Sequence, residues 1–121
     1  MKKLTISLIQ IDIKTANVIE NFEKAGKFIE KAANRKSDFI VLPEMWSTGF
    51  AYLDFLTIAK KFYKDTIDFL KHHAHHSKAT IIGGSIPEIE NDKIYNTCFV
   101  IDNSGKLIGS YRKMHIFSPT G

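Results

Sequence analysis

The sequence predicts an α/β fold with a mixed β-sheet. Apolar runs at residues 4–11, 39–42 and 79–84 are typical of short strands, and amphipathic segments of helical period separate them. Two further strand patterns follow, each preceded by a turn of a few residues. A strand, helix, strand order requires a right-handed parallel crossover, whereas short turns join antiparallel strands. The sheet is therefore expected to contain both kinds of pairing.

The first strand and the first helix follow from residues 4–34. Residues 4–11 begin with alternation and end apolar, which predicts a strand with at least one buried face. Asn17 is predicted to cap the next helix, and Glu20 follows three residues later, as in a capping box. The helix then carries an apolar stripe at three- and four-residue steps, formed by Val18, Phe22, Ala25, Ile29 and Ala32. Gly26 inside it indicates close packing on a neighbour or simple tolerance.

The second strand ends at a carboxylate. Residues 39–42 are all apolar, which predicts a strand buried on both faces, and Pro43 cannot donate to the sheet ladder. Glu44 is therefore expected at the carboxyl end of a strand, where ligands bind in open α/β sheets. With the bulky Met45 and Trp46 beside it, Glu44 is a candidate general base. Taken alone, the motif fits a solvated glutamate at a strand end better than a catalytic one, and a second motif later in the chain changes that balance.

The second helix is predicted from Phe55 to about Ser77. Its apolar positions are Phe55, Ile58, Phe62, Phe69 and Leu70, and its wet side carries Lys60, Lys61, Lys64 and Asp65. The strand at residues 79–84 follows and leads into Gly83-Gly84-Ser85. This triplet lacks the further glycine, the lysine and the helix that a phosphate-binding loop requires. It is interpreted as a strand end where two backbones approach closely.

The last two strands, residues 94–101 and 107–111, follow turns at 90–92 and 102–105. Lys113 comes just after the second of them. If that strand runs parallel to residues 39–42, Lys113 and Glu44 emerge at the same edge of the sheet. A carboxylate that moves protons and an ammonium that stabilises a developing oxyanion then form a pair suited to acyl chemistry. A solvated terminal lysine is the alternative.

Two other groups of reactive side chains are predicted to be structural. Cys98 lies within an apolar strand, where burial raises the pKa of a thiol and blocks access, so it is not the expected nucleophile. His72, His73, His75 and His76 lie near the end of the second helix. They are interpreted as a wet surface that complements the helix dipole, because a three-ligand metal site needs more than this helix offers.

Composition limits the class of protein. A chain of 121 residues with 44% hydrophobic content suits one domain with one core. The net charge of +4 comes from scattered lysines rather than a basic cluster, so nucleic-acid binding is not expected. The single cysteine excludes an intrachain disulfide and a cysteine-based zinc site. We expect a cytoplasmic protein without a signal peptide or a membrane span, because no apolar run is long enough for either.

The motifs around Glu44 and Lys113, taken in order, resemble those of the nitrilase or carbon–nitrogen hydrolase superfamily. The matching blocks are residues 5–10, 42–50, 83–85, 95–97 and 109–117. The resemblance implies half of an αββα sandwich, with one mixed sheet and two helices on one face of it. It also implies hydrolysis of non-peptide C–N bonds by a Glu, Lys and Cys triad that uses no metal and no organic cofactor.

The same resemblance assigns roles to residues. Glu44 is the expected general base and Lys113 the expected stabiliser of the tetrahedral intermediate. Trp46, Phe50 and Tyr52 are expected to line the pocket, with His115 beside the reacting groups. The residues around Glu44 are similar to those of ω-amidase-like members, which deamidate 2-oxo dicarboxylic acid monoamides. The substrate class expected is therefore a small amide or carbamoyl compound.

The family's cysteine lies beyond the position of Lys113, and residues 114–121 contain none. Residues 1–121 are therefore expected to be the amino-terminal portion of a single domain and inactive alone. One sheet face is then bare and apolar, which predicts poor solubility, self-association or binding of a complementary chain. Homodimers are also implied by the resemblance.

Two alternatives remain open. A catalytically inactive remnant that serves as a binding or interaction module would share the same fold. An unrelated flavodoxin-like domain would need a phosphate-gripping loop after the first strand, yet residues 12–17 contain no glycine.

Overall fold

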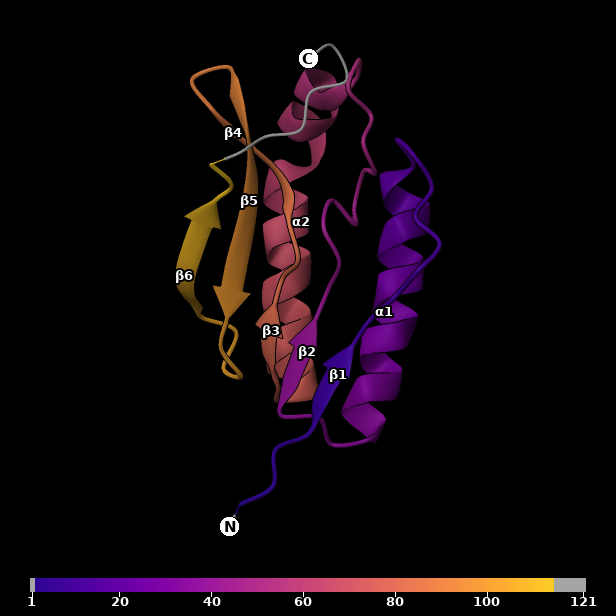
Figure 1. Ribbon diagram of the computed structural model, residues 1–121, viewed down its shortest axis with the longest axis vertical. Coiled ribbons are helices and arrows are strands. Elements are labelled where there is room, and N and C mark those ends of the chain that lie inside the picture. Colours follow the sequence, from indigo (N-terminus) through magenta and orange to yellow (C-terminus); the bar gives the residue numbers. More distant parts are fainter. Residues whose placement is uncertain (1, 115–121) are drawn as a thin grey trace.

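A computed structural model describes residues 2–114 of the chain and confirms the α/β class (Figure 1). Along this part of the chain the elements are β1 (Ile6–Leu8), α1 (Val18–Asn34), β2 (Phe39–Val41), α2 (Phe55–Ser77), β3 (Thr80–Ile82), β4 (Ile86–Glu90), β5 (Lys93–Ile101) and β6 (Leu107–Arg112). Within these residues no helix is long and apolar enough to cross a membrane.

The strands form one mixed sheet. The order is β1-β2-β3-β5-β4, and β6 pairs with the other edge of β5. β1, β2 and β3 run parallel, whereas β5 is antiparallel to β3, β4 and β6. The two antiparallel steps from β3 to β5 and from β5 to β6 restore the original direction. β6 therefore runs parallel to β2, which is the condition for Glu44 and Lys113 to share one end of the sheet.

The sequence patterns do not predict β4. Pro87 lies inside it, and a proline argues against a central strand because it cannot donate to the ladder. The structure shows why a proline is accommodated there. β4 is at the edge of the sheet and pairs only with β5, where Pro87 is opposite Asn96. A strand with one paired edge tolerates a missing N–H.

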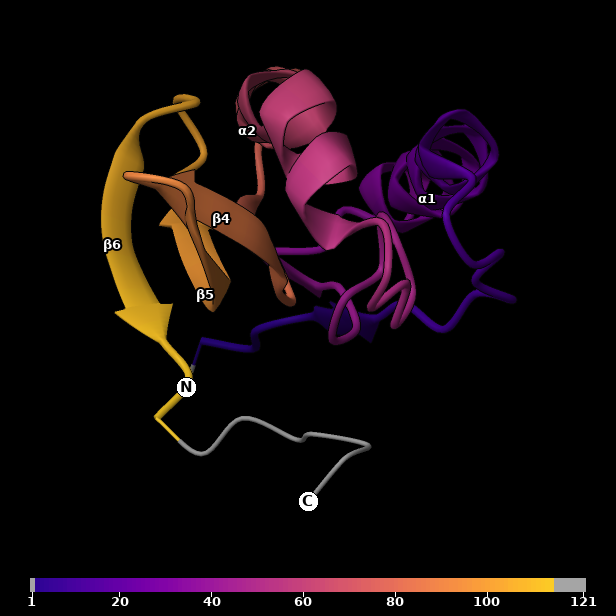
Figure 2. The same cartoon turned by 90° about the horizontal axis from the view of Figure 1, so that it is seen from above.

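Both helices cover the same face of the sheet (Figure 2). Ala25 and Ile29 of α1 and Leu70 and Ala74 of α2 pack in one core with apolar side chains from the strands, namely Ile40, Ile81, Phe99 and Ile101. The predicted cap of α1 is confirmed, since the Asn17 side chain accepts a hydrogen bond from the Glu20 N–H at 3.1 Å.

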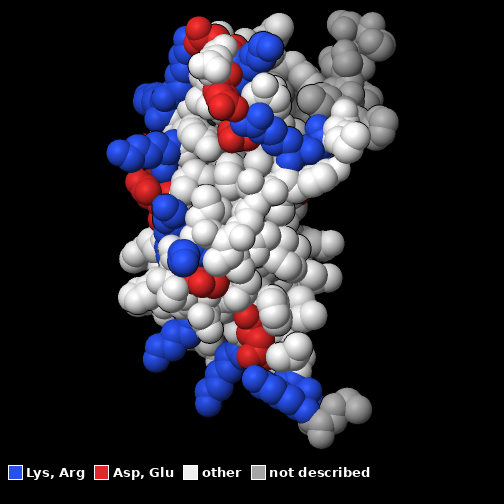
Figure 3. Space-filling view, turned by 90° about the vertical axis from the view of Figure 1, so that its left-hand side faces the viewer, with Lys and Arg blue, Asp and Glu red and all other residues white. Residues whose placement is uncertain are grey.

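The opposite face of the sheet is apolar and has no cover within residues 2–114. Strand register places these side chains in adjacent rows: Ile6, Leu8, Phe39, Val41, Ile82, Val100, Cys98 and Tyr111. At the two ends of the set, Leu8 is 74% exposed and Tyr111 is 61% exposed. Figure 3 shows a broad uncharged region on the β6 side of the molecule, bordered by charged groups. We call these eight residues the open face.

His73 is the histidine that differs from the expected wet surface. Its ring lies at a tilt of 51° to that of Phe69, with the centroids 4.3 Å apart. A Cβ at Gly26 of α1 would meet the His73 ring at 3.6 Å, an ordinary contact distance, so the glycine is tolerated at this helix contact rather than required by it. Burial, together with the neighbouring His72 and His76, lowers the pKa of His73 to about 4. Among the described residues no group of three or more His, Cys, Asp or Glu side chains could hold a metal ion.

We expect His73 to make stability depend on pH. Its pKa of about 4 in the folded chain lies below the ordinary 6.5, so the unfolded chain binds more protons between these values. Stability should fall as the pH drops through this window and should be unaffected by this group above it. Melting temperatures of the wild type and of H73F from pH 7 to pH 4 test this, with H75F as the exposed control. An equally steep fall in H73F would contradict the prediction.

Candidate active site

Glu44 begins a tight turn that the Gly83-Gly84-Ser85 segment supports. Gly84 has a φ of +61°, and a Cβ added there would lie 2.0 Å from the carbonyl oxygen of Pro43. The Ser85 N–H donates to that same oxygen at 3.2 Å, and the Ser85 hydroxyl accepts from the Met45 N–H at 3.0 Å. The predicted close approach of two backbones at this segment is confirmed. These contacts hold the loop that carries Glu44 in place.

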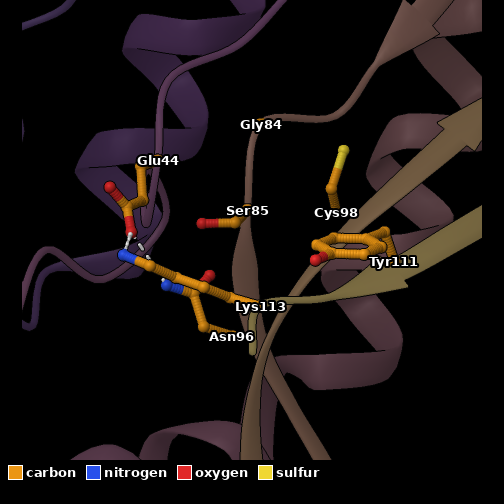
Figure 4. Close-up of a pocket in the computed structure, with 7 residues that line it drawn as sticks. All are labelled: Glu44, Gly84, Ser85, Asn96, Cys98, Tyr111 and Lys113. Atoms are coloured by element: carbon orange, nitrogen blue, oxygen red, sulfur yellow. Dashed lines mark hydrogen bonds and ion pairs between the residues drawn. The ribbon is translucent and has the colours of Figure 1, made fainter. Parts of the chain in front are cut away.

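Lys113 reaches Glu44 from the end of β6 (Figure 4). Its ammonium donates to Oε1 of Glu44 at 2.8 Å. The two side chains are 39% and 47% exposed, so the pair is open to a ligand. The backbone N–H of Lys113 donates to the Asn96 carbonyl oxygen at 2.8 Å, which extends the pairing of β5 with β6 by one residue. The structure therefore brings together the two residues that the sequence predicts at one edge of the sheet.

The surroundings of Glu44 favour its ionised form. The hydrogen bond from Lys113 lowers the pKa of Glu44 below its ordinary value, and partial burial opposes this effect. A hydrogen bond from Asn96 and the positive charge of Lys113 lower the pKa of Glu44 further. At neutral pH the group is a carboxylate, which is the form that accepts a proton.

The pair lies in an open hollow of about 310 Å³. Its lining comprises Glu44, Gly84, Ser85, Asn96, Cys98, Tyr111 and Lys113. The lining comes from the turns after β2 and β3 and from β5 and β6, so four segments that are distant in the sequence meet here. A volume of this size suits a small molecule.

Cys98 is mid-strand, as the sequence predicts, but it lies on the open face rather than in the helix-covered core. Its thiol lines the hollow, and the sulfur lies 3.9 Å from the carbonyl oxygen of Phe99. Burial raises the pKa of Cys98, so the thiol stays neutral at neutral pH. This agrees with a structural role and argues against Cys98 as the nucleophile.

Trp46 does not line the hollow within the described residues. Its side chain is fully buried, and the indole N–H donates to the carbonyl oxygen of Gly83 at 2.9 Å. Its ring packs against Phe22 and Phe69. In the turn that begins at Glu44, the Glu44 side chain is exposed, whereas the side chain of Trp46, two residues later, lies in the helix-covered core.

Phe50 and Tyr52 lie apart from the hollow. Their rings stack 5.9 Å apart, and Tyr52 meets Phe55 at the start of α2 edge-on at 5.5 Å. They are 45% and 38% exposed, so they belong to the surface of the loop before α2. Their contact with a substrate stays a prediction. His115 lies outside the described residues.

The sequence patterns did not predict a cluster around Arg112, the residue before Lys113. Arg112 donates from Nε to Glu88 at 2.8 Å and from its terminal nitrogen to Glu90, while its guanidinium lies 3.8 Å from the centroid of the Tyr95 ring. The Thr97 hydroxyl also donates to Glu88 at 2.7 Å. These contacts tie the last residue of β6 across β5 to β4, next to Lys113. The charges are readable in the sequence, but their pairing depends on strand register.

The family is decided by comparison with known proteins. Residues 5–121 match the model of the carbon-nitrogen hydrolase family. The chain belongs to this family. It is 36% identical to 2-oxoglutaramate amidase of Bacillus subtilis (strain 168) over 115 residues, which covers 95% of this chain and 44% of that protein. It is 32% identical to omega-amidase NIT3 of Saccharomyces cerevisiae over 124 residues, with 96% and 43% covered.

Solved structures agree with the fold of this carbon–nitrogen hydrolase chain. The crystal structure of Saccharomyces cerevisiae Nit3, a member of branch 10 of the nitrilase superfamily, matches with a TM-score of 0.82 and 29% identity, covering 93% of this chain and 44% of that one. An amidase from Nesterenkonia sp. matches with a TM-score of 0.86 and 17% identity, covering 96% and 44%, and supports the fold alone. The chain thus spans less than half the length of the relatives that it matches.

Proposed function

We propose that residues 1–121 are the amino-terminal portion of a carbon–nitrogen hydrolase domain that cleaves an amide bond of a small molecule. In this proposal Glu44 is the general base and Lys113 stabilises the oxyanion. The observation that carries it is the 2.8 Å contact between the Lys113 ammonium and Glu44 Oε1, at the shared carboxyl end of β2 and β6. Membership of the family supports the reaction class.

The proposed chemistry requires a cysteine thiol from the remainder of the domain. Glu44 takes the thiol proton as the sulfur attacks the substrate carbonyl, and the Lys113 ammonium binds the oxygen that becomes negative. The proton then leaves with the nitrogen as ammonia, and the product of this step is a thioester. Water activated by Glu44 resolves the thioester to the acid and the free thiol. These steps use side chains alone, so the proposal includes no metal and no organic cofactor.

The ion pair itself suits this sequence of steps. While Glu44 is ionised, the Lys113 ammonium is bound to it at 2.8 Å. Once Glu44 accepts a proton, the attraction between opposite charges is lost, and only a weaker hydrogen bond to the neutral acid holds the ammonium. The ammonium is then free to turn towards the oxyanion, which forms at the same moment.

For the substrate we propose the ω-amide of a 2-oxo dicarboxylic acid. The relatives named as 2-oxoglutaramate amidase and omega-amidase NIT3 support this choice, because each aligns over at least 95% of the chain. The residues around Glu44 support it as well. A catalytically inactive remnant that acts as an interaction module is the competing function.

Ammonia release by the full-length protein tests the proposal. The polypeptide that carries residues 1–121, together with any sequence beyond Gly121, should be assayed with a panel of ω-amides and N-carbamoyl compounds. We expect release from 2-oxoglutaramate well above that from the N-carbamoyl compounds. Release from the carbamoyl compounds alone would overturn the substrate, and a folded protein that releases no ammonia from any of them would overturn the reaction.

We further propose that the open face packs on the remainder of the domain. Without that partner, residues 1–121 should self-associate, because burial of apolar surface contributes about 25 cal/mol per Å².

Sedimentation velocity of the 121-residue chain should show dimers or larger species. The double variant L8K/Y111K, with two charges on the open face, should shift the chain towards monomer. L53K is the matched control, since Leu53 is fully exposed and lies before α2. A monomeric wild-type chain at tens of micromolar would contradict the prediction.

A further inference from the structure

We propose that Asn96 is a positioning residue of this site. It holds the Glu44 carboxylate in the orientation in which Oε1 faces Lys113, and it thereby leaves Oε2 as the oxygen that takes up the proton. The inference rests on the proposed function, because it names how the base of that reaction is oriented. Asn96 belongs to the 95–97 motif, to which the proposed chemistry assigns no role.

Asn96 touches both members of the pair through different groups. Its side-chain Nδ2 donates to Glu44 Oε1 at 3.0 Å, and its backbone carbonyl oxygen accepts from the Lys113 N–H at 2.8 Å. The side-chain contact joins positions 52 residues apart in the sequence. One residue of β5 therefore sets the position of the Glu44 carboxylate and of the Lys113 backbone at once (Figure 4).

The two donors engage the same oxygen of Glu44. Lys113 Nζ and Asn96 Nδ2 both donate to Oε1, and no group among residues 2–114 donates to Oε2. A carboxylate oxygen has two lone pairs, so two donors occupy Oε1 fully. The lone pairs of Oε2 remain available, and this oxygen is the one free to receive a proton from the nucleophile. Without the Asn96 contact, rotation of the carboxylate would exchange the two oxygens.

The orientation of the Asn96 amide is unambiguous. An ionised carboxylate only accepts hydrogen bonds, so the amide nitrogen must face Glu44. Oδ1 is then buried and accepts no hydrogen bond from the described residues. A buried acceptor without a partner is destabilising, and leucine, which is close to asparagine in size, would avoid that loss. The amide at this place is therefore accounted for by its donation to Glu44 rather than by packing.

The test uses the full-length protein with N96D and N96L, and with N103L in the exposed turn after β5 as the control. The first readout is the pKa of Glu44, followed by carbon-13 NMR of its side-chain carboxyl and assigned with E44Q. Both variants should raise the pKa of Glu44, because one removes a donor and the other adds a like charge. N103L should leave it unchanged. This readout needs no turnover, so it separates failure of the inference from failure of the proposed function.

The second readout is kinetic. In both variants the acidic limb of the pH profile of kcat/KM should move to higher pH, and kcat on the plateau should fall about a hundredfold with little change in KM. A neutron crystal structure below the pKa of Glu44 should place the deuteron on Oε2. Folded N96D and N96L proteins with an unchanged Glu44 pKa and an unchanged acidic limb would overturn the inference. A deuteron on Oε1 would overturn the assignment of the oxygen. If N96L fails to fold, N96D, which has the same shape as the wild type, decides.

Discussion

Replacing Glu44 with glutamine in the full-length protein should lower the rate of ammonia release about a thousandfold or more. Glutamine keeps the shape of the side chain and still accepts hydrogen bonds from Lys113 and Asn96 at its oxygen. It cannot take up a proton, and the proposed reaction needs the base in both the attack of the thiol and the attack of water. General acid and base groups typically contribute 10²- to 10⁴-fold to a rate.

Stability should barely change in E44Q, which separates this effect from unfolding. The carboxylate is 47% exposed, and exposed ion pairs contribute about 0–1 kcal/mol. The measurement is steady-state ammonia release together with the melting temperature. E23Q is the matched control, because Glu23 lies exposed on α1, away from the hollow. An E44Q protein with wild-type activity would exclude Glu44 as the base.

The pH profile of the wild type gives a further check on the same residue. Because the pKa of Glu44 is lowered, the carboxylate persists when the pH falls below neutral. The acidic limb of kcat/KM should therefore lie below the ordinary pKa of a glutamate, and loss of activity should follow protonation of the base.

The largest expected loss of stability comes from replacing Gly84 with alanine. Two effects add, since the φ of +61° is strained for a residue with a side chain and the new Cβ would lie 2.0 Å from the Pro43 carbonyl oxygen. Relief requires the loop that carries Glu44 to move away from β3. We expect a destabilisation of about 4 kcal/mol or more, which is exceptional for a single substitution.

G26A is the matched control for this prediction. Gly26 lies in α1, and a Cβ there would meet only the rings of His73 and Phe69, at 3.6 Å or more, which is an ordinary contact distance. Alanine at this position should raise stability by up to about 1 kcal/mol, because it favours the helix over glycine. Urea denaturation of both variants of the full-length protein provides the comparison. Equal midpoints for G84A and G26A would show that the backbone contact at Pro43 does not constrain the loop.

The positions of residues that follow from strand direction could be predicted from the sequence. Glu44 follows an apolar run ended by Pro43, and Lys113 follows the last strand pattern. Once the number of antiparallel steps is known, both must emerge at one edge of the sheet. The Asn17 cap of α1 and the apolar stripes of α1 and α2 are local patterns too, and the period of the stripes already shows which side is buried.

The positions of side chains that depend on the conformation of a turn or on strand register could not be predicted from the sequence. The sequence predicts Trp46 beside the pocket because it follows Glu44 by two residues, yet the turn places its indole against Phe22 and Phe69. Asn96 has no feature in the sequence that distinguishes it as a partner of Glu44. Its role depends on the register of β5 against β6, in which a shift by one residue would turn its side chain to the other face.

By itself the sequence determined the α/β class, the order of all elements except β4, and the two charged residues of the site. Those properties arise from local period and from chain direction, which neighbouring residues encode. Tertiary structure alone decided which donors meet which oxygen of Glu44, because strand register and the close backbone contact at Gly84 join residues that are 40 or more positions apart.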